Sequence, residues 1–225
     1  MTIRPDRRAE NTQLRALAAS QNVLNRADGS AKFEFGETSV MVSVVGPVDV
    51  SHRDEKLDEA TVEVVVRPAT GYPATNEKLL ESILRTAFEP VILAGMMPRT
   101  LIQIVVQVMK DDGSILAAAI NGITLALLDA GVPMKSITAA ISCTIDKNTN
   151  EILLDPTTEE LEDAGSEHIF AFNNDPSSSL LLSNSTGQFS QDQYFECYNV
   201  CYKAVDKVHG FLRVAIESKK QKEYQ

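Results

Sequence analysis

A run of small, mostly apolar residues near the middle of the chain constrains the fold more than any other feature. Residues Ile115–Ala130 carry no charged side chain before Asp129. A helix that is apolar on every side has no face to turn toward water, so this run predicts a central helix buried among other elements. Gly131 suits the end of that helix, and Pro133 prevents it from continuing.

Strand patterns lie before and after this helix in the sequence. The predicted strands are residues 33–35, 38–45, 60–67, 101–109, 136–145, 152–154, 168–172 and 180–183. Because residues 101–109 are predominantly apolar, we predict that this strand is buried on both faces. Further helices are predicted at residues 76–88, 157–163 and 190–219. Antiparallel strand clusters with helices between them predict an α+β fold.

The length of 225 residues fits one large domain or two small ones. Since both strand clusters share one predicted core, we expect a single domain at residues 14–219. A flexible polar segment at residues 1–13 precedes it, and a basic tail at residues 220–225 follows it. The first residues lack the apolar core of a signal peptide. The apolar stretches at residues 91–97 and 115–120 are too short to span a membrane.

Acidic side chains outnumber basic ones, with 31 Asp and Glu against 21 Lys and Arg and a formal net charge of −10. Proteins that hold nucleic acid alone usually carry a basic face, because phosphate contacts supply most of the non-specific affinity. The charge therefore disfavours a chain that binds RNA or DNA unaided. The odd number of cysteines, without the spacing of a disulfide framework, indicates thiols in a reducing compartment.

Common site motifs are absent from the sequence. It contains neither a phosphate-binding loop of the Gly-x-x-x-x-Gly-Lys type nor a dinucleotide fingerprint. Cys197 and Cys201 lie on one helix face without a second ligand pair, which favours core residues over a zinc site. We predict no metal site and no cofactor. The acidic residues between positions 155 and 167 leave two readings open, a Mg²⁺ site or a solvated helix face.

Six sequence segments, in order along the chain, resemble the RNase PH family. They are Ala-Asp-Gly-Ser-Ala at 27–31, Gly-Glu-Thr-Ser-Val with a later Gly-Pro at 36–47, Pro-Arg-Thr at 98–100, Gln-Val and Asp-Gly-Ser at 107–114, Ala-Leu-Leu-Asp-Ala-Gly-Val-Pro-Met at 126–134, and Leu-Asp-Pro-Thr-Thr-Glu-Glu at 154–160. The resemblance covers roughly residues 14–217. It implies the RNase PH fold, an α+β architecture of the ribosomal protein S5 domain 2 type.

Active members of the family, as the resemblance implies, use inorganic phosphate to attack the 3′-terminal phosphodiester of RNA. An arginine after the Asp-Gly turn holds that phosphate, and here the slot falls on Leu116, or on Ile115 after a one-residue shift. The two family aspartates fall on Leu161 and Glu167. Residues 72–77, where active members hold the RNA backbone with arginines, contain no cation. Loss of one charge ligand of the transition state typically costs on the order of a hundredfold in rate.

The resemblance therefore implies a non-catalytic subunit of the six-membered ring of the eukaryotic RNA exosome, supporting 3′-to-5′ RNA processing and rRNA maturation. The implied partners are other RNase PH-like ring subunits, S1/KH cap subunits, a catalytic nuclease bound to the ring, and RNA contacted within the complex. The implied locations are nucleus, nucleolus and cytoplasm, with no membrane contact. Whether the isolated chain forms a homodimer stays open.

Two alternatives assign activity to the chain itself. One is a phosphorolytic exoribonuclease that uses other residues, and the other is a metal-dependent hydrolytic nuclease. The second would be built on Glu160, Glu162, Asp163 and Glu167. If the chain instead helps to thread RNA through a ring, the candidate RNA contacts are His52, Arg53 and Arg99.

Overall fold

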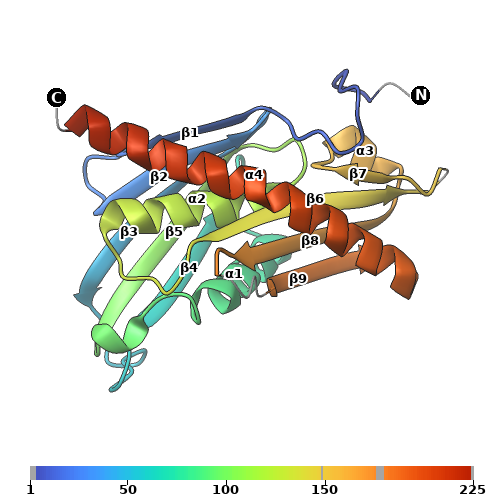
Figure 1. The fold of residues 1–225 in the computed structure, drawn as a ribbon. Helices are drawn as coiled ribbons and strands as arrows, with labels where there is room; N and C mark the ends of the chain where they lie inside the picture. The colour runs from blue at the N-terminus through green and yellow to red at the C-terminus, as the bar shows by residue number, and fades with distance from the viewer. Residues whose placement is uncertain (1–3, 148, 176–179, 224–225) are drawn as a thin grey trace.

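Helix α2, residues Ile115–Ala130, lies between two β-sheets, as its uncharged sequence predicts (Figure 1). The computed structural model describes residues 4–147, 149–175 and 180–223. The remaining residues include parts of the predicted N-terminal segment, C-terminal tail and turn at 147–150, and these parts lie outside the described residues. Four layers follow one another in space: the five-stranded sheet, helices α1 and α2, the four-stranded sheet, and helix α4. This arrangement confirms the predicted α+β class.

The first sheet has five strands in the order β1-β2-β3-β5-β4. Their bounds are β1 Leu17–Gln21, β2 Gly29–Phe35, β3 Thr38–Asp49, β5 Thr100–Lys110 and β4 Thr61–Arg67. All neighbours pair antiparallel except β4 and β5, which are parallel. Because β4 stands last in the strand order, it forms one edge of the sheet. Helix α1, Thr75–Phe88, packs beside β4, and the short 3-10 helix η1, Ala94–Met96, precedes β5.

The second sheet has four antiparallel strands in the order β7-β6-β8-β9. Their bounds are β7 Ile152–Leu154, β6 Thr138–Asp146, β8 Ala164–Asn173 and β9 Leu180–Gly187. The short helix α3, Thr158–Glu162, joins β7 to β8, and the long helix α4, Gln191–Glu223, covers the outer face of the sheet. None of the described helices is both long enough and apolar enough to cross a membrane.

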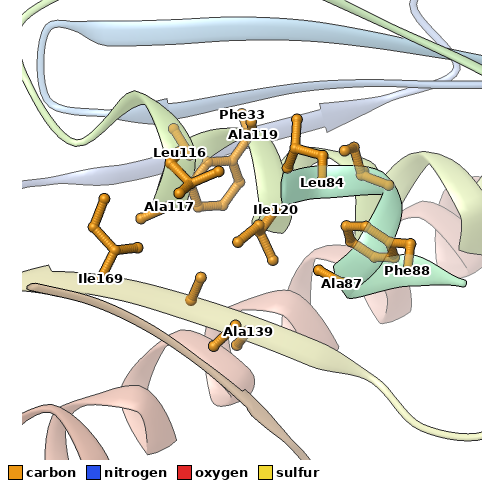
Figure 2. Close-up of a cluster of buried hydrophobic side chains, with 14 of the residues drawn as sticks. Phe33, Leu84, Ala87, Phe88, Leu116, Ala117, Ala119, Ile120, Ala139 and Ile169 are labelled. Atoms are coloured by element: carbon orange, nitrogen blue, oxygen red, sulfur yellow. The ribbon is translucent and has the colours of Figure 1, made fainter. Parts of the chain in front are cut away.

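One hydrophobic cluster joins all these layers. Figure 2 shows Phe33 of the first sheet, Ile120 of α2 and Ala139 of the second sheet in the same group of buried side chains. Helix α2 contributes to this cluster along most of its length, because residues 116–127 are all buried. Its close approach to β2 depends on Gly29, where an added Cβ would lie 2.3 Å from the backbone nitrogen of Ala130.

Helix α4 contacts both sheets. Its first half places Cys197 and Cys201 against the second sheet, where both are fully buried free thiols, as the core interpretation predicts. A hydrogen bond with Cys143 and burial raise the pKa of the Cys197 thiol. The second half of α4 reaches the first sheet, where the rings of Phe211 and Phe33 lie 6.2 Å apart.

Strand β5 differs from its sequence-based expectation. Alternate residues such as Ile102 and Ile104 are fully buried, whereas Gln103 and Gln107 are only half-buried. The strand thus has one core face and one partly solvated face. The prediction of burial on both faces was wrong because it gave too little weight to the two glutamines, which occupy the alternating positions expected of a half-exposed strand.

Candidate active site at the start of helix α2

Three chain segments meet where helix α2 begins. The first is the turn that precedes the helix, with Gly113 at φ +80° and Ser114 at φ +60°. The second follows β7, where the Ser114 hydroxyl donates a hydrogen bond of 3.2 Å to the carbonyl oxygen of Pro156. The third is the stretch just before β1, where Arg15 donates a hydrogen bond of 2.7 Å to the carbonyl oxygen of Asp112. This is where the family resemblance locates the phosphate site.

Protein atoms pack against this turn on the side where a side chain at Gly113 would project. A Cβ there would lie 2.7 Å from the carbonyl oxygen of Pro156 and 3.2 Å from a methyl carbon of Leu161. Leu116 is 3% exposed and belongs to the core cluster with Ala117 and Ile169 (Figure 2). A helix start binds an anion through free N–H groups and nearby positive charge. Here its first turn is enclosed by aliphatic side chains and by the backbone of a neighbouring loop.

A buried ion pair fixes the loop that closes this turn. Arg15 contacts both carboxylate oxygens of Asp155, at 2.9 Å from Nε and 2.6 Å from Nη2. The Arg15 backbone N–H also donates to Asp155, at 3.0 Å. Burial by itself would lower the pKa of Arg15, but the hydrogen bond and charge of Asp155 outweigh it and the pKa is raised. Asp155 adopts φ +51°, a left-handed conformation that the bidentate pair holds in place.

The N-terminal segment takes part in the same network. Arg4 contacts both carboxylate oxygens of Glu160, at 2.6 and 2.7 Å. Arg8 donates hydrogen bonds to the carbonyl oxygens of Leu154 and Asp155, at 3.1 and 2.9 Å. Burial and the neighbouring charge of Arg4 lower the pKa of Arg8. These two arginine side chains are buried, unlike the solvated stretch expected at residues 1–13, whereas residues 5–7, 9–10 and 12–13 are exposed as expected. Carboxylates and carbonyls far away in the sequence provide the partners that local composition does not reveal.

The acidic residues near α3 have unlike environments. Glu160 is 8% exposed and is neutralised by Arg4, whereas Glu162 and Asp163 are exposed. Glu167 lies half-buried on β8, and burial raises its pKa. Within residues 4–147, 149–175 and 180–223, no group of three or more His, Cys, Asp or Glu side chains is arranged to hold a metal ion.

The structure brings the substituted family positions to one end of α2. Leu161 approaches Gly113, one turn before Leu116. Glu167 precedes Ile169 by two residues, so both project from the same face of β8, toward the layer that contains Leu116. The sequence identified these positions by resemblance, but nothing in its pattern indicated Arg4, Arg8 or Arg15 as the groups that neutralise the neighbouring carboxylates.

The three candidate RNA contacts lie on exposed surface near one carboxylate. Glu55 lies 3.6 Å from Nδ1 of His52 and 3.6 Å from Nε of Arg99. The His52 side chain is fully exposed, and Arg99 and Arg53 are exposed as well. Glu55 therefore brings His52 and Arg99 together and reduces the local positive charge. Their contact with RNA stays a prediction.

The other two histidines are buried and should make stability depend on pH. Burial lowers the pKa of His168 and of His209 below the ordinary value near 6.5. As pH falls below about 6.5, the unfolded chain takes up protons that the folded chain does not bind. We expect the free energy of unfolding to fall by up to about 1.4 kcal/mol per group for each pH unit.

Urea unfolding of the protein at pH 7.5, 6.5 and 5.5 measures this dependence. His168→Gln retains a side chain that can bond the hydroxyls of Ser166 and Ser185 but does not titrate, and should flatten the profile. His52→Gln, the same substitution at a fully exposed side chain, is the matched control for the effect of the substitution itself. Equal profiles for the wild type and His168→Gln would contradict the expectation.

Both domains of one protein family match the sequence. The description "3' exoribonuclease family, domain 1" matches residues 13–133, and "domain 2" of the same family matches residues 136–204. The exosome complex component RRP46 of Saccharomyces cerevisiae is 37% identical over 213 residues, covering 88% of this chain and 96% of the relative. The exosome complex exonuclease RRP46 homolog of Arabidopsis thaliana is 33% identical over 226 residues, covering 93% and 94%.

The fold also matches a solved structure over nearly its whole length. The crystal structure of rice Rrp46 superimposes with a TM-score of 0.89 at 32% identity, covering 95% of this chain and 100% of the rice chain. Sequence and fold thus agree on the same group of relatives.

Proposed function

The chain belongs to the 3′ exoribonuclease (RNase PH) family, among its eukaryotic exosome ring members, and from this premise we propose that it is a non-catalytic structural subunit of the exosome core ring. In this role it supports 3′-to-5′ RNA processing and decay, including rRNA maturation, by forming part of the channel through which RNA passes. Chemistry takes place on another subunit of the complex.

The enclosed start of helix α2 carries this proposal. Phosphorolysis brings a phosphate dianion toward an anionic backbone, so the site must supply positive charge and free N–H donors. Leu116 is buried in the family's arginine slot, and no Lys or Arg occurs in the sequence between Lys110 and Lys135. The carbonyl oxygen of Pro156 and a methyl carbon of Leu161 pack around Gly113, and the cation beside this turn, Arg15, is already paired with Asp155.

A metal-dependent nuclease finds less support in the same residues. Glu160 is already engaged by Arg4 and by the backbone N–H of Thr157, so it is not a free ligand. Glu162 and Asp163 are exposed beyond the end of α3, while Glu167 lies on β8. Because the Arabidopsis relative is named an exonuclease, the activity of this chain deserves a direct measurement.

We expect the purified chain to release neither nucleoside diphosphates nor monophosphates from a single-stranded RNA. The assay uses inorganic phosphate with Mg²⁺ for phosphorolysis and Mn²⁺ or Mg²⁺ alone for hydrolysis, with chromatography of the products. Release of diphosphates from a clean preparation would overturn the proposal. Release of monophosphates that Glu162→Gln or Glu167→Gln abolishes would instead support the hydrolytic alternative.

The partners and cellular locations belong to the same proposal. We expect other RNase PH-like ring subunits, S1/KH cap subunits and a ring-bound catalytic nuclease in one assembly, located in nucleus, nucleolus and cytoplasm. Purification of the tagged chain at native expression level, followed by size and composition analysis, tests this expectation. Recovery with nine or more different subunits supports it, whereas recovery only as a homodimer would contradict it.

RNA contact within that assembly should involve Arg99, Arg53 and His52. Their position on exposed loops, rather than at the enclosed start of α2, favours contact with a strand that passes by over contact with a bound 3′ end. Site-specific crosslinking of RNA to the assembled complex, compared between wild type and the Arg53→Gln/Arg99→Gln variant, measures their share. Unchanged crosslinking at this subunit would exclude them.

A further inference from the structure

An open groove lies along the free edge of the first sheet, beside strand β4. Residues 61–64 of β4 form one wall, and Lys78, Glu81, Ser82 and Arg85 of helix α1 line the other. Spacings of three and four residues place these α1 residues on one face of the helix. The groove has a volume of about 570 Å³. An edge strand and a helix face thus lie side by side and form the two walls of the groove.

The backbone of β4 offers unused hydrogen-bonding groups to this groove. The N–H of Val66 points away from β5 and donates to the carboxylate of Glu81 at 3.0 Å. Because successive N–H groups of a strand point to opposite edges, those of Val62 and Val64 point the same way as that of Val66. Among the residues that the structure describes, nothing accepts a hydrogen bond from them. The α1 helix therefore satisfies one end of this edge, while Val62 and Val64, only 4% and 6% exposed, line the groove with N–H groups that are unpaired within the described chain.

The charges of the groove indicate a ligand with both signs of charge. Lys78 is paired with Glu81 at 2.7 Å, so neither is available. Arg85 and Asp54 also line the groove, and within the described chain neither side chain forms an ion pair. The three carboxylates Asp54, Glu63 and Glu81 outnumber the two cations, which disfavours a polyanion such as RNA.

We propose that this groove binds an extended peptide segment of a partner protein, which adds a sixth strand to the first sheet beside Val62 and Val64. Its main chain pairs with the open edge of β4, an acidic side chain faces Arg85, and a basic one faces Asp54. A second copy of this chain fits less well, because its own β4 edge is flanked by its own α1 (Figure 1). The inference concerns a surface away from the start of α2 and does not depend on the function proposed above.

Amide hydrogen exchange of the full ¹⁵N-labelled chain tests the proposal. The probe is a positional-scanning set of acetylated, amidated octapeptides that alternate valine with polar residues and carry one glutamate and one lysine. We expect binding members to slow exchange at Val62 and Val64 at least tenfold. Exchange at Val65, whose N–H faces β5, and at Val66, already bonded to Glu81, should not change. If no member slows Val62 and Val64, the proposal is wrong.

Two further comparisons separate strand addition from other kinds of contact. N-methylation of the peptide at the residues that pair with β4 should abolish binding, whereas methylation of the intervening residues should not. Arg85→Gln should weaken binding several-fold, while Arg67→Gln, a matched change on β4 outside the groove lining, should not. Equal effects of both methylation patterns, protection by a decauridylate in place of the peptide, or protection that rises with protein concentration alone would each overturn the proposal.

Discussion

Replacing Arg15 by methionine should lower the free energy of unfolding by about 3–5 kcal/mol, because it leaves the buried Asp155 carboxylate without its partner. Both side chains are buried, with 5% and 1% of their surface exposed, and the pair is bidentate. Water cannot replace the lost guanidinium at this depth. Chemical denaturation followed by circular dichroism measures the loss.

A double-mutant comparison distinguishes the stranded charge from lost packing. Asp155→Asn suits the left-handed backbone at this position and removes the charge, so Arg15→Met/Asp155→Asn should regain part of the stability lost in Arg15→Met. Lys56→Met removes an exposed pair with Glu59 and should cost less than about 1 kcal/mol. A double variant less stable than Arg15→Met would show that the loss comes from packing instead.

Replacing Gly29 by alanine is expected to be the second large change, with a loss of about 3 kcal/mol, at the upper end of overpacking costs. The new methyl group would lie 2.3 Å from the backbone nitrogen of Ala130 and 2.4 Å from the carbonyl oxygen of Ala126. These are backbone atoms of a helix that is packed on several sides, so no flexible side chain can move away. Helix α2 would have to shift relative to β2.

The same substitution at Gly210 provides the control. This glycine lies within helix α4, and an added Cβ would meet nothing within 4 Å. Alanine is the better helix former, so Gly210→Ala should raise the free energy of unfolding by about 1 kcal/mol. Thermal and urea unfolding of the two variants in parallel measure both effects. A loss at Gly29 of less than about 0.5 kcal/mol, well below the range of overpacking costs, would contradict the close contact between β2 and α2.

Much of the fold could be predicted because its signals are local. Helix α2 begins and ends at the predicted residues, since an uncharged segment followed by glycine and proline indicates a buried helix and its end. Strand β1, Leu17–Gln21, was not predicted, because its sequence Leu-Ala-Ala-Ser-Gln has little strand preference. It forms a strand through pairing with β2, and that pairing is a tertiary contact.

The cap of helix α1 is a smaller example of the same limit. Thr75 and Asn76 have suitable side chains, yet the helix begins at Thr75 and Ala74 precedes it. The backbone N–H of Ala74 donates to the Glu77 carboxylate at 2.7 Å. This hydrogen bond stabilises the start of the helix although position 74 has no capping side chain. Composition alone ranks Thr and Asn as caps and does not indicate which residue leaves the helical conformation first.

The sequence by itself determined the central helix, most strands and the α+β class, because these depend on residues close together in the chain. It also determined the absence of cations at the family's phosphate position, because that depends only on which residue stands at each position. Only the tertiary structure decided that Arg4, Arg8 and Arg15 neutralise Glu160 and Asp155, partners 140–156 residues away. It also decided that Leu161 closes the turn before α2 and that β4 keeps an open edge. Ion pairs, buried contacts and free edges depend on distance in space, and one sequence does not reveal which distant residues become neighbours.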